Sequence, residues 1–203
     1  MKKMYKAMAL VLCAILLVVG SVMGTLAYLQ AETAPVNNTF AVGKVAITLK
    51  ETAIDPKTGK EITGDPVTGL TNIKLVPSRE IKKNPFVTVE AGSEKCYVFV
   101  KLENNIPTEY GKLNGFVGAW TLIDETNKIY VYTGAFAADG VVDASAAAQR
   151  LDVFTSFTCA DNITAYAGET NLAITITAYA VQAEGFGSAT AAWTATFGAP
   201  SNG

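Results

Sequence analysis

The feature that most constrains the fold is a set of short runs in which apolar and polar residues alternate. Val45, Ile47 and Leu49 occupy every second position, as do Ile174 and Ile176 further along the chain. A period of two places alternate side chains on opposite faces of an extended strand, whereas a helix repeats every 3.6 residues. About seven such runs are separated by turn residues, so the sequence predicts an all-β, jelly-roll-like antiparallel β-sandwich with short helices in its loops.

The other predicted strands are rich in β-branched and aromatic residues, and they cover residues 85–90, 95–103, 118–124, 128–133, 152–158 and 171–183. The run 95–103 is almost continuously apolar, which is typical of a strand covered on both faces. Within it we expect Val98, Val100 and Leu102 to face the interior between two sheets.

Helical patterns are few and short. Residues 144–151 are rich in alanine and follow Asp143, a residue suited to cap a helix N-terminus, so we expect a helix there. A second alanine-rich segment, residues 188–196, is compatible with either a helix or a strand.

The first 27 residues are typical of a secretory signal peptide. Three lysines within the first six residues precede an apolar run from Ala7 to Val19, which as a helix is about 20 Å long and short for a bilayer span. Thr25 and Ala27 supply the small residues at −3 and −1 that a signal peptidase accepts. The sequence predicts cleavage after Ala27, a mature N-terminus at Tyr28 and an exported body, with an uncleaved N-terminal anchor as the alternative.

The remaining residues, 28–203, fit one domain that is large enough to bury its own core. Loss of the three N-terminal lysines makes the formal net charge of −2 more negative by three. No basic tract and no run of basic residues interleaved with aromatic ones remains, so we expect no nucleic-acid partner.

Two cysteines, Cys96 and Cys159, remain after removal of the signal peptide. Export permits a disulfide between them. Two buried thiols are the alternative, because cysteine also packs as a small apolar residue.

The chain contains no histidine. This excludes nucleophile systems that depend on histidine, HExxH zinc hydrolysis and histidine-ligated metal sites. It also contains no CxxC pair and no glycine-rich phosphate loop between a strand and a helix. We therefore predict no catalytic residues, no metal ligands and no cofactor.

The pattern Asp-Pro-x-Thr-Gly occurs twice, at residues 55–59 and 65–69. Proline fixes φ and aspartate bonds its own backbone, so both copies favour type I turns within a protruding loop. A calcium site built from Asp55, Glu61 and Asp65 is the alternative, although the spacing matches no known calcium loop.

Carboxylate pairs and aromatic stripes are interpreted in the same way, as structural features. The pairs are Asp124 with Glu125, Glu103 with Glu109, and Asp139 with Asp143; each lies in a polar stretch typical of a solvated turn. The stripes are Tyr97 with Phe99, and Tyr130 with Tyr132. They favour a packed core over a carbohydrate platform.

Three blocks of the sequence together resemble the TasA/camelysin family of exported Gram-positive proteins. The first block matches at Gly24, Thr25, Ala27 and Tyr28, and then at Asn38, Thr39, Phe40, Gly43, Val45, Ile47 and Leu49. The second matches at Lys83, Asn84, Pro85, Val87, Val89, Gly92, Tyr97 and Val98, and the third covers residues 176–186. These blocks cover about a third of the chain.

The resemblance implies maturation by a SipW-type signal peptidase and a role as a secreted subunit of biofilm matrix fibres or of the cell surface. In such fibres the N-terminal strand of one subunit completes a sheet of its neighbour, so the partner is a second copy and, beyond it, other matrix proteins. The matching donor-strand residues here are Phe40, Val42, Val45, Ile47 and Leu49. Camelysin-like metallopeptidase activity is an alternative that the lack of histidine opposes, and a monomeric adhesin-like module is another.

Residues 28–38 contain few large apolar side chains, so we expect a mobile N-terminal arm, the alternative being an ordinary frayed terminus. Ile47 is expected at a central strand position, where a proline would remove a ladder hydrogen bond.

Overall fold

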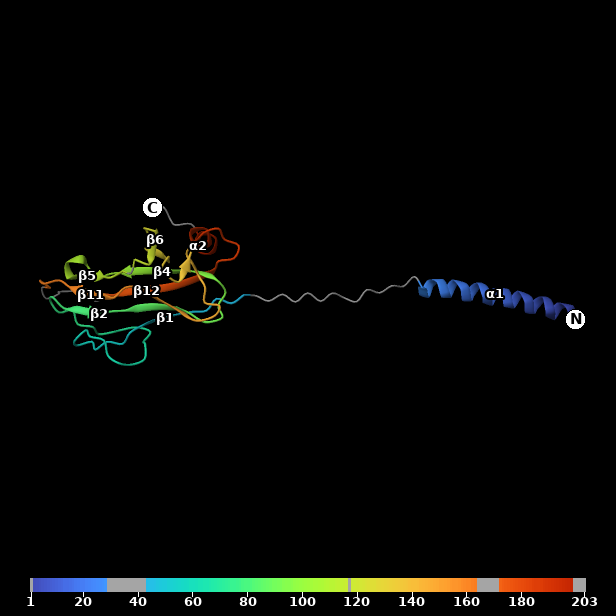
Figure 1. Cartoon of the computed structure of the whole chain (residues 1–203), viewed down its shortest axis with the longest axis horizontal. Coiled ribbons are helices and arrows are strands. Elements are labelled where there is room, and N and C mark those ends of the chain that lie inside the picture. The colour runs from blue at the N-terminus through green and yellow to red at the C-terminus, as the bar shows by residue number, and fades with distance from the viewer. Residues whose placement is uncertain (1, 29–42, 117, 164–171, 199–203) are drawn as a thin grey trace. The chain divides into compact units, whose positions relative to one another are not determined.

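The computed structural model describes residues 2–28, 43–116, 118–163 and 172–198 (Figure 1). The chain divides into two compact units, Met1–Ala41 and Val42–Gly203. The described part of the first unit is one helix, α1 (Lys2–Tyr28), whose large apolar side chains are exposed, with Leu10 at 72% and Leu17 at 75%. Within the described residues, no helix meets the length and hydropathy needed to cross a membrane. The helix covers the predicted signal peptide, whose removal stays a prediction.

The second unit consists of antiparallel strands in three sheets. One sheet has the order β1 (Ile47–Glu51), β3 (Pro85–Val89), β10 (Gln149–Asp152), and another has the order β2 (Glu80–Lys82), β11 (Ser156–Cys159), β5 (Gly111–Asn114). The largest contains β6 (Trp120–Asp124), β7 (Ile129–Tyr132), β4 (Cys96–Asn104), β9 (Val141–Val142) and β8 (Ala137–Ala138), and β12 (Ile174–Gln182) pairs with β4. A 3₁₀ turn (Thr108–Tyr110) precedes β5, and α2 (Ala189–Phe197) follows β12. The all-β antiparallel sandwich predicted from the alternation is confirmed.

The main core lies between the β1–β3–β10 sheet and the largest sheet. Val87 and Val89 of β3 meet Val98 and Val100 of β4 there, all at 0% exposure. Leu102 packs partly buried against the same cluster. The three β4 residues expected to face the interior therefore do so.

The strand β4 is covered on both faces, as its continuous apolar sequence predicts. Its odd-numbered residues Tyr97 and Phe99 belong to a second cluster, in which the ring of Phe99 lies 5.1 Å from that of Trp193 of α2 in a tilted arrangement. Tyr132 is 4% exposed in the main core and Tyr130 packs against it. Both aromatic stripes are thus core, which confirms that interpretation.

The two expected helices have different outcomes. Residues 189–197 are helical, with Ser188 as N-cap: its side-chain oxygen accepts a hydrogen bond from the amide of Ala191 at 3.2 Å. The helix predicted over residues 144–151 is wrong. Asp143 instead holds a turn by accepting from the amide and hydroxyl of Ser145 (3.0 and 2.6 Å). Pairing of β10 with β3 buries Leu151 to 1%, and this tertiary gain outweighs alanine's helix propensity.

The strand predicted over residues 152–158 is in fact a corner between two sheets. β10 ends at Asp152 and pairs with β3, whereas β11 begins at Ser156 and pairs with β2 and β5. Val153 and Phe154 fill the bend at 0% exposure, so the run is apolar throughout although its hydrogen-bonding partners change.

Candidate functional site

The predicted processing and donor residues fall in different parts of the chain. Ala27 and Tyr28 are the last residues of α1. Phe40 and Val42 lie outside the described residues. The other three donor-strand residues, Val45, Ile47 and Leu49, are partly buried against the chain's own main core. Within one subunit these three residues complete their own sheet.

β1 is an edge strand. It pairs with β3 alone among the strands, and the Glu90 amide donates to the Ala46 carbonyl at 2.9 Å. Because hydrogen-bonded and non-bonded pairs alternate in an antiparallel ladder, Ile47 and Leu49 direct their amides away from β3. The expectation that Ile47 holds a central position and donates to the ladder is therefore wrong. The open stretch is short, because Glu51 exchanges two hydrogen bonds of 2.8 Å with Val67.

β12 forms a longer open edge. All nine of its residues pair with β4, and in the described part of the chain no strand pairs with its other side. Flanking bonds from the Ala183 amide to Lys95 and from the Asn105 amide to Ala173 (2.8 and 2.9 Å) fix which residues bond to β4. The outward amides and carbonyls belong to Ile174, Ile176, Ala178, Ala180 and Gln182.

The open edges of β1 and β12 border the same core. Ile47 and Leu49 of β1, like Ile176 and Ala178 of β12, are only partly buried, although all four pack against the main core cluster. In both strands these are residues whose backbone groups point outward. β1 and β12 approach each other to within 8 Å between Cα atoms, and no ladder joins them in the described residues, so both strands keep outward backbone groups beside half-exposed apolar side chains.

The other edge strands of the sheets are short, or their outward sides are protected. β10 has four residues, and its Asp152 carbonyl accepts from the indole of Trp120 at 2.8 Å. Arg150 lies 3.6 Å above the Phe86 ring and pairs with Asp152. β6 has five residues and a register shift between Leu122 and Asp124. Charges and bulges of this kind discourage strand addition.

A hollow lies at each end of β12. The one at the Ile174 end has a volume of about 610 Å³. Many of its lining residues are aliphatic, namely Leu70, Ile73, Leu75, Ile106, Leu172 and Ile174, but polar atoms make up about half of its exposed surface. Its one charged side chain, Lys83, is tied to Glu51 by a bond of 2.6 Å, and both side chains are nearly buried.

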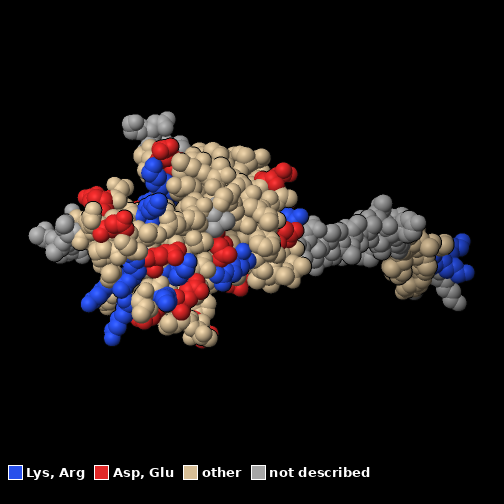
Figure 2. Space-filling model, turned by 60° about the vertical axis from the view of Figure 1, so that its left-hand side comes forward, with Lys and Arg blue, Asp and Glu red and all other residues tan. Residues whose placement is uncertain are grey.

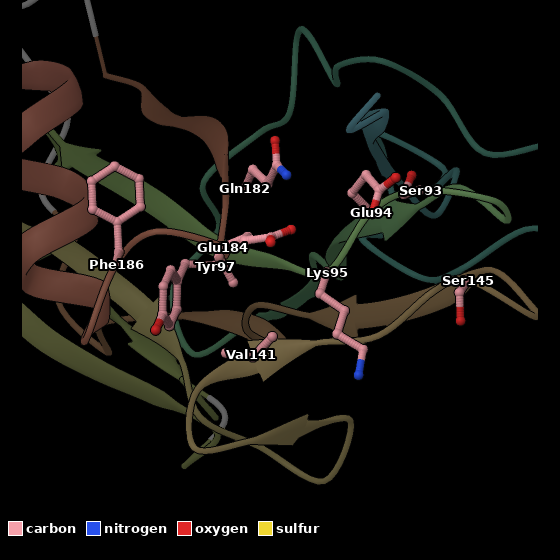
Figure 3. A pocket seen from close by; sticks show the side chains of 10 residues that line it. Ser93, Glu94, Lys95, Tyr97, Val141, Ser145, Gln182, Glu184 and Phe186 are labelled. Carbon is pink, nitrogen blue, oxygen red and sulfur yellow. The ribbon is translucent and has the colours of Figure 1, made fainter. Parts of the chain in front are cut away.

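At the Gln182 end lies a hollow of about 470 Å³, shown in Figure 3. Most of its exposed lining surface is apolar, although charged residues border it. Glu94, Lys95 and Glu184 bring charges to it, beside Tyr97 and Phe186. Lys95 also pairs with Asp143 at 3.4 Å. No bond joins the two glutamates, and nothing in the lining forms a nucleophile–base pair.

The described residues of the second unit begin near the Gln182 end of β12. The Glu94 amide donates to the Lys44 carbonyl at 3.0 Å, and a Cβ on Gly43 would lie 2.7 Å from Cγ of Glu94. Gly43, the first described residue of the second unit, therefore lies near the Gln182 end of β12.

Cys96 and Cys159 are free thiols in separate core clusters, which favours buried thiols over the disulfide. Burial raises the pKa of the Cys96 thiol to about 11, so it is held as the unreactive thiol.

The predicted loop turn is present at the first Asp-Pro copy. Asp55 accepts from the Lys57 amide and the Thr58 hydroxyl, both at 2.9 Å, and these bonds hold its pKa below the usual value. Its oxygens are thus engaged in the turn. Among the described residues no group of three or more His, Cys, Asp or Glu side chains is placed to hold a metal ion.

The carboxylate pairs were expected in solvated turns. For Glu103 this is wrong, because it lies in strand β4 and forms an ion pair with Lys101 at 2.7 Å. Asp124 accepts from the amide and side chain of Asn127 at 2.9 and 2.8 Å, which lowers its pKa. Asp143 has a lowered pKa because it accepts from Ser145.

Sequence reasoning found β12 as a strand but did not identify its open edge. A signal was present: residues 174–180 alternate, whereas 96–100 are continuously apolar. Alternation indicates a strand that is covered less completely than its neighbour. It cannot say which backbone edge is unpaired, because that depends on topology.

Acidic and basic side chains interleave on the lower part of the face shown in Figure 2, below a broad uncharged area.

A scan against family models and searches of curated proteins and solved structures found no match to this chain.

Proposed function

We propose that this protein is a secreted structural subunit of extracellular matrix or cell-surface fibres. Its subunits assemble when the N-terminal segment of one copy adds as a strand to the open β12 edge of another. The observation that carries this proposal is the nine-residue edge of β12, with outward backbone groups beside half-exposed core side chains. Main-chain hydrogen bonds would supply affinity there, and alternate side chains would supply specificity.

The segment before the body has the sequence pattern that such an edge requires. Four of the five even positions in residues 34–42, Ala34, Val36, Phe40 and Val42, are apolar, and Asn38 is polar; the odd positions are Pro35, Asn37, Thr39 and Ala41. A strand of these residues would present a mainly apolar face to the main core beside β12. Residues 34–42 equal β12 in length.

Export is part of the same proposal. The lysine-rich start, the apolar run within α1 and the small residues Thr25 and Ala27 support processing to Tyr28. The resemblance to the TasA/camelysin family adds a SipW-type signal peptidase as processing partner and other matrix proteins as neighbours in the fibre. Sequencing of the secreted protein should therefore begin at Tyr28.

Electron microscopy of the secreted protein tests the function. The parent should form fibres, and a variant lacking residues 28–38 should remain a folded monomer, because too little of the segment is left to cover β12. A deletion variant that forms the same fibres as the parent overturns strand donation by this segment.

A matched pair of substitutions separates strand addition from a general effect of charge. Phe40→Asp places a charge on the face directed toward the main core and should abolish fibres. Thr39→Asp places the same charge on the opposite face and should leave fibres intact. A monomeric binding module or a peptidase would keep its activity in both variants and in the deletion.

A further inference from the structure

We infer that this protein also has a carbohydrate-binding site, an open hollow between α2, β12 and the β6–β7 turn that binds one neutral pyranose ring of a polysaccharide. The inference goes beyond the proposed function and does not depend on strand addition, because the hollow lies on the face of the large sheet opposite to the main core. It follows from the side chains that meet in this hollow and from their charges.

The hollow has a volume of about 250 Å³ and forms where α2 packs against β12 (Figure 1). Its lining includes Lys101 of β4, Asp124 and Asn127 at the β6–β7 turn, Tyr179 of β12, and Trp193 and Phe197 of α2. Most of its exposed surface is polar, and a smaller part is apolar. Such a surface suits a ligand that carries many hydroxyl groups better than a lipid or an aliphatic side chain.

Three aromatic rings meet at one side of the hollow. The ring centroid of Tyr179 lies 5.1 Å from that of Phe197 and 5.3 Å from that of Trp193, and the last two lie 4.5 Å apart. Trp193 is buried in the second cluster, whereas Phe197 is 45% exposed. The Phe197 ring is thus held by its neighbours and still offers an apolar surface, against which the C–H groups on one face of a pyranose can lie.

The polar groups at the other side of the hollow are fixed before any ligand binds. Asp124 is buried, and its carboxylate accepts from the amide and the side chain of Asn127 at 2.9 and 2.8 Å. A carboxylate can accept about four hydrogen bonds, so it retains capacity for a sugar hydroxyl. The Tyr179 hydroxyl forms no hydrogen bond within the described residues and can donate to a ligand or accept from it.

The charges around the hollow favour a neutral ligand over an anionic one. The Nζ atom of Lys101 lies 2.7 Å from the carboxylate of Glu103, which offsets its charge. The charge of Asp124 is then left in excess, and it repels anions. The hydroxyls of a neutral sugar can donate to Asp124 and accept from Lys101 without placing an unpaired charge in the hollow.

Equilibrium dialysis of the secreted protein against labelled tetrasaccharides tests the site. The neutral probes are 1,4-linked tetramers of glucose, mannose and N-acetylglucosamine, and the anionic probe is the 1,4-linked tetramer of galacturonate. We expect at least one neutral tetramer to bind and the galacturonate tetramer not to bind. Bound sugar should also change the tryptophan emission, because Trp193 lines the hollow whereas Trp120, the other tryptophan, lies in the main core.

Two exposed phenylalanines provide a matched pair of variants. Phe197→Ala removes the ring at the hollow and should weaken binding about tenfold. Phe136→Ala removes a ring that is 50% exposed but does not line this hollow, so binding should be unchanged. Tyr179→Phe keeps the ring and removes only the hydroxyl, and it should weaken binding about threefold. Circular dichroism checks that each variant is folded.

Four results overturn the site. They are no binding of any neutral tetramer at about 10 mM, tighter binding of the galacturonate tetramer, equal losses in Phe136→Ala and Phe197→Ala, and full binding in both Phe197→Ala and Tyr179→Phe. Dialysis measures binding by monomers and fibres alike. Absence of fibres from the parent protein therefore contradicts the proposed function and leaves the sugar site intact.

Discussion

β1 and β12 are both edge strands beside the main core, but they differ in how far their outward backbone groups remain unpaired. β1 has five residues, and its outward side is stopped at Glu51, whose backbone bonds to Val67 and whose carboxylate pairs with Lys83. β12 has nine residues and no such stop along its outward side within the described residues. An unpaired edge of that length normally invites association, and proteins that do not use it protect it.

Within this sandwich, some edge strands are protected against the addition of another strand and β12 is not. β1 carries a short open stretch limited by a bridge and a buried ion pair, and β10 carries an arginine and an aspartate on its edge. β12 carries alanines and isoleucines packed against the main core and threonines on its exposed side. Protection is therefore applied selectively, and the unprotected strand is the one that we propose as the acceptor edge.

The largest expected effect comes from β4, which alone attaches β12 to the sheet. Val100 is 0% exposed and pairs with Ala178 of β12. Val100→Asp buries a charge without a partner, which costs about 3–5 kcal/mol or more of the 5–15 kcal/mol typical of a domain. Loss of the cooperative unfolding transition in denaturant is the expected result. A soluble Val100→Asp protein that unfolds cooperatively like the parent would contradict the buried position of β4.

The next largest effect concerns the buried ion pair between Glu51, at the end of β1, and Lys83. Lys83→Met leaves the Glu51 carboxylate buried without its partner and should lower the free energy of unfolding by about 3–5 kcal/mol. Adding Glu51→Gln to it removes the orphaned charge and should restore most of that loss, because replacing both partners of a buried pair is often nearly neutral. Denaturation of the two variants gives the comparison. Equal losses in the single and double variants would show that the pair is not a coupled unit.

A pair of prolines compares the two edges directly. Ala178→Pro removes an outward amide from β12 without removing a bond to β4, so the subunit should stay folded but accept no donor strand. Ile47→Pro does the same on β1 and also removes an isoleucine from the core, so it should lower stability yet leave fibre formation by the folded fraction. Because Ala178→Pro subunits keep their own donor segment, adding them to growing parent protein should cap fibres and shorten them. Light scattering and microscopy follow both effects. Fibres from Ala178→Pro at the parental rate would remove β12 as the acceptor edge.

Much of the sandwich could be predicted from period-two alternation, and less of its edges. The continuous apolar run in β4 predicted its burial on both faces. β3 and β12 were predicted at nearly their observed bounds. The corner at Val153 and Phe154 was not foreseen, because a run that stays buried while changing sheets looks like one strand. The helix expected over 144–151 failed because alanine's propensity is weak beside strand pairing. The open edge of β12 is a property of topology, and no local pattern encodes which neighbours a strand lacks.

The smallest effect concerns the β6–β7 hairpin, an edge of the large sheet that the proposal leaves outside assembly. Asp124 accepts two hydrogen bonds from Asn127, and these hold its pKa below the usual value. A carboxylate with a lowered folded pKa contributes stability above its unfolded pKa of about 4, and that contribution is lost as pH falls through the folded value. Asp124→Asn should therefore be slightly less stable than the parent at pH 7, and the difference should shrink below about pH 4. Thermal unfolding across this range checks it. Fibre formation at pH 7 should be the same in both proteins; a loss of fibres in Asp124→Asn would mean that this edge, too, takes part in assembly.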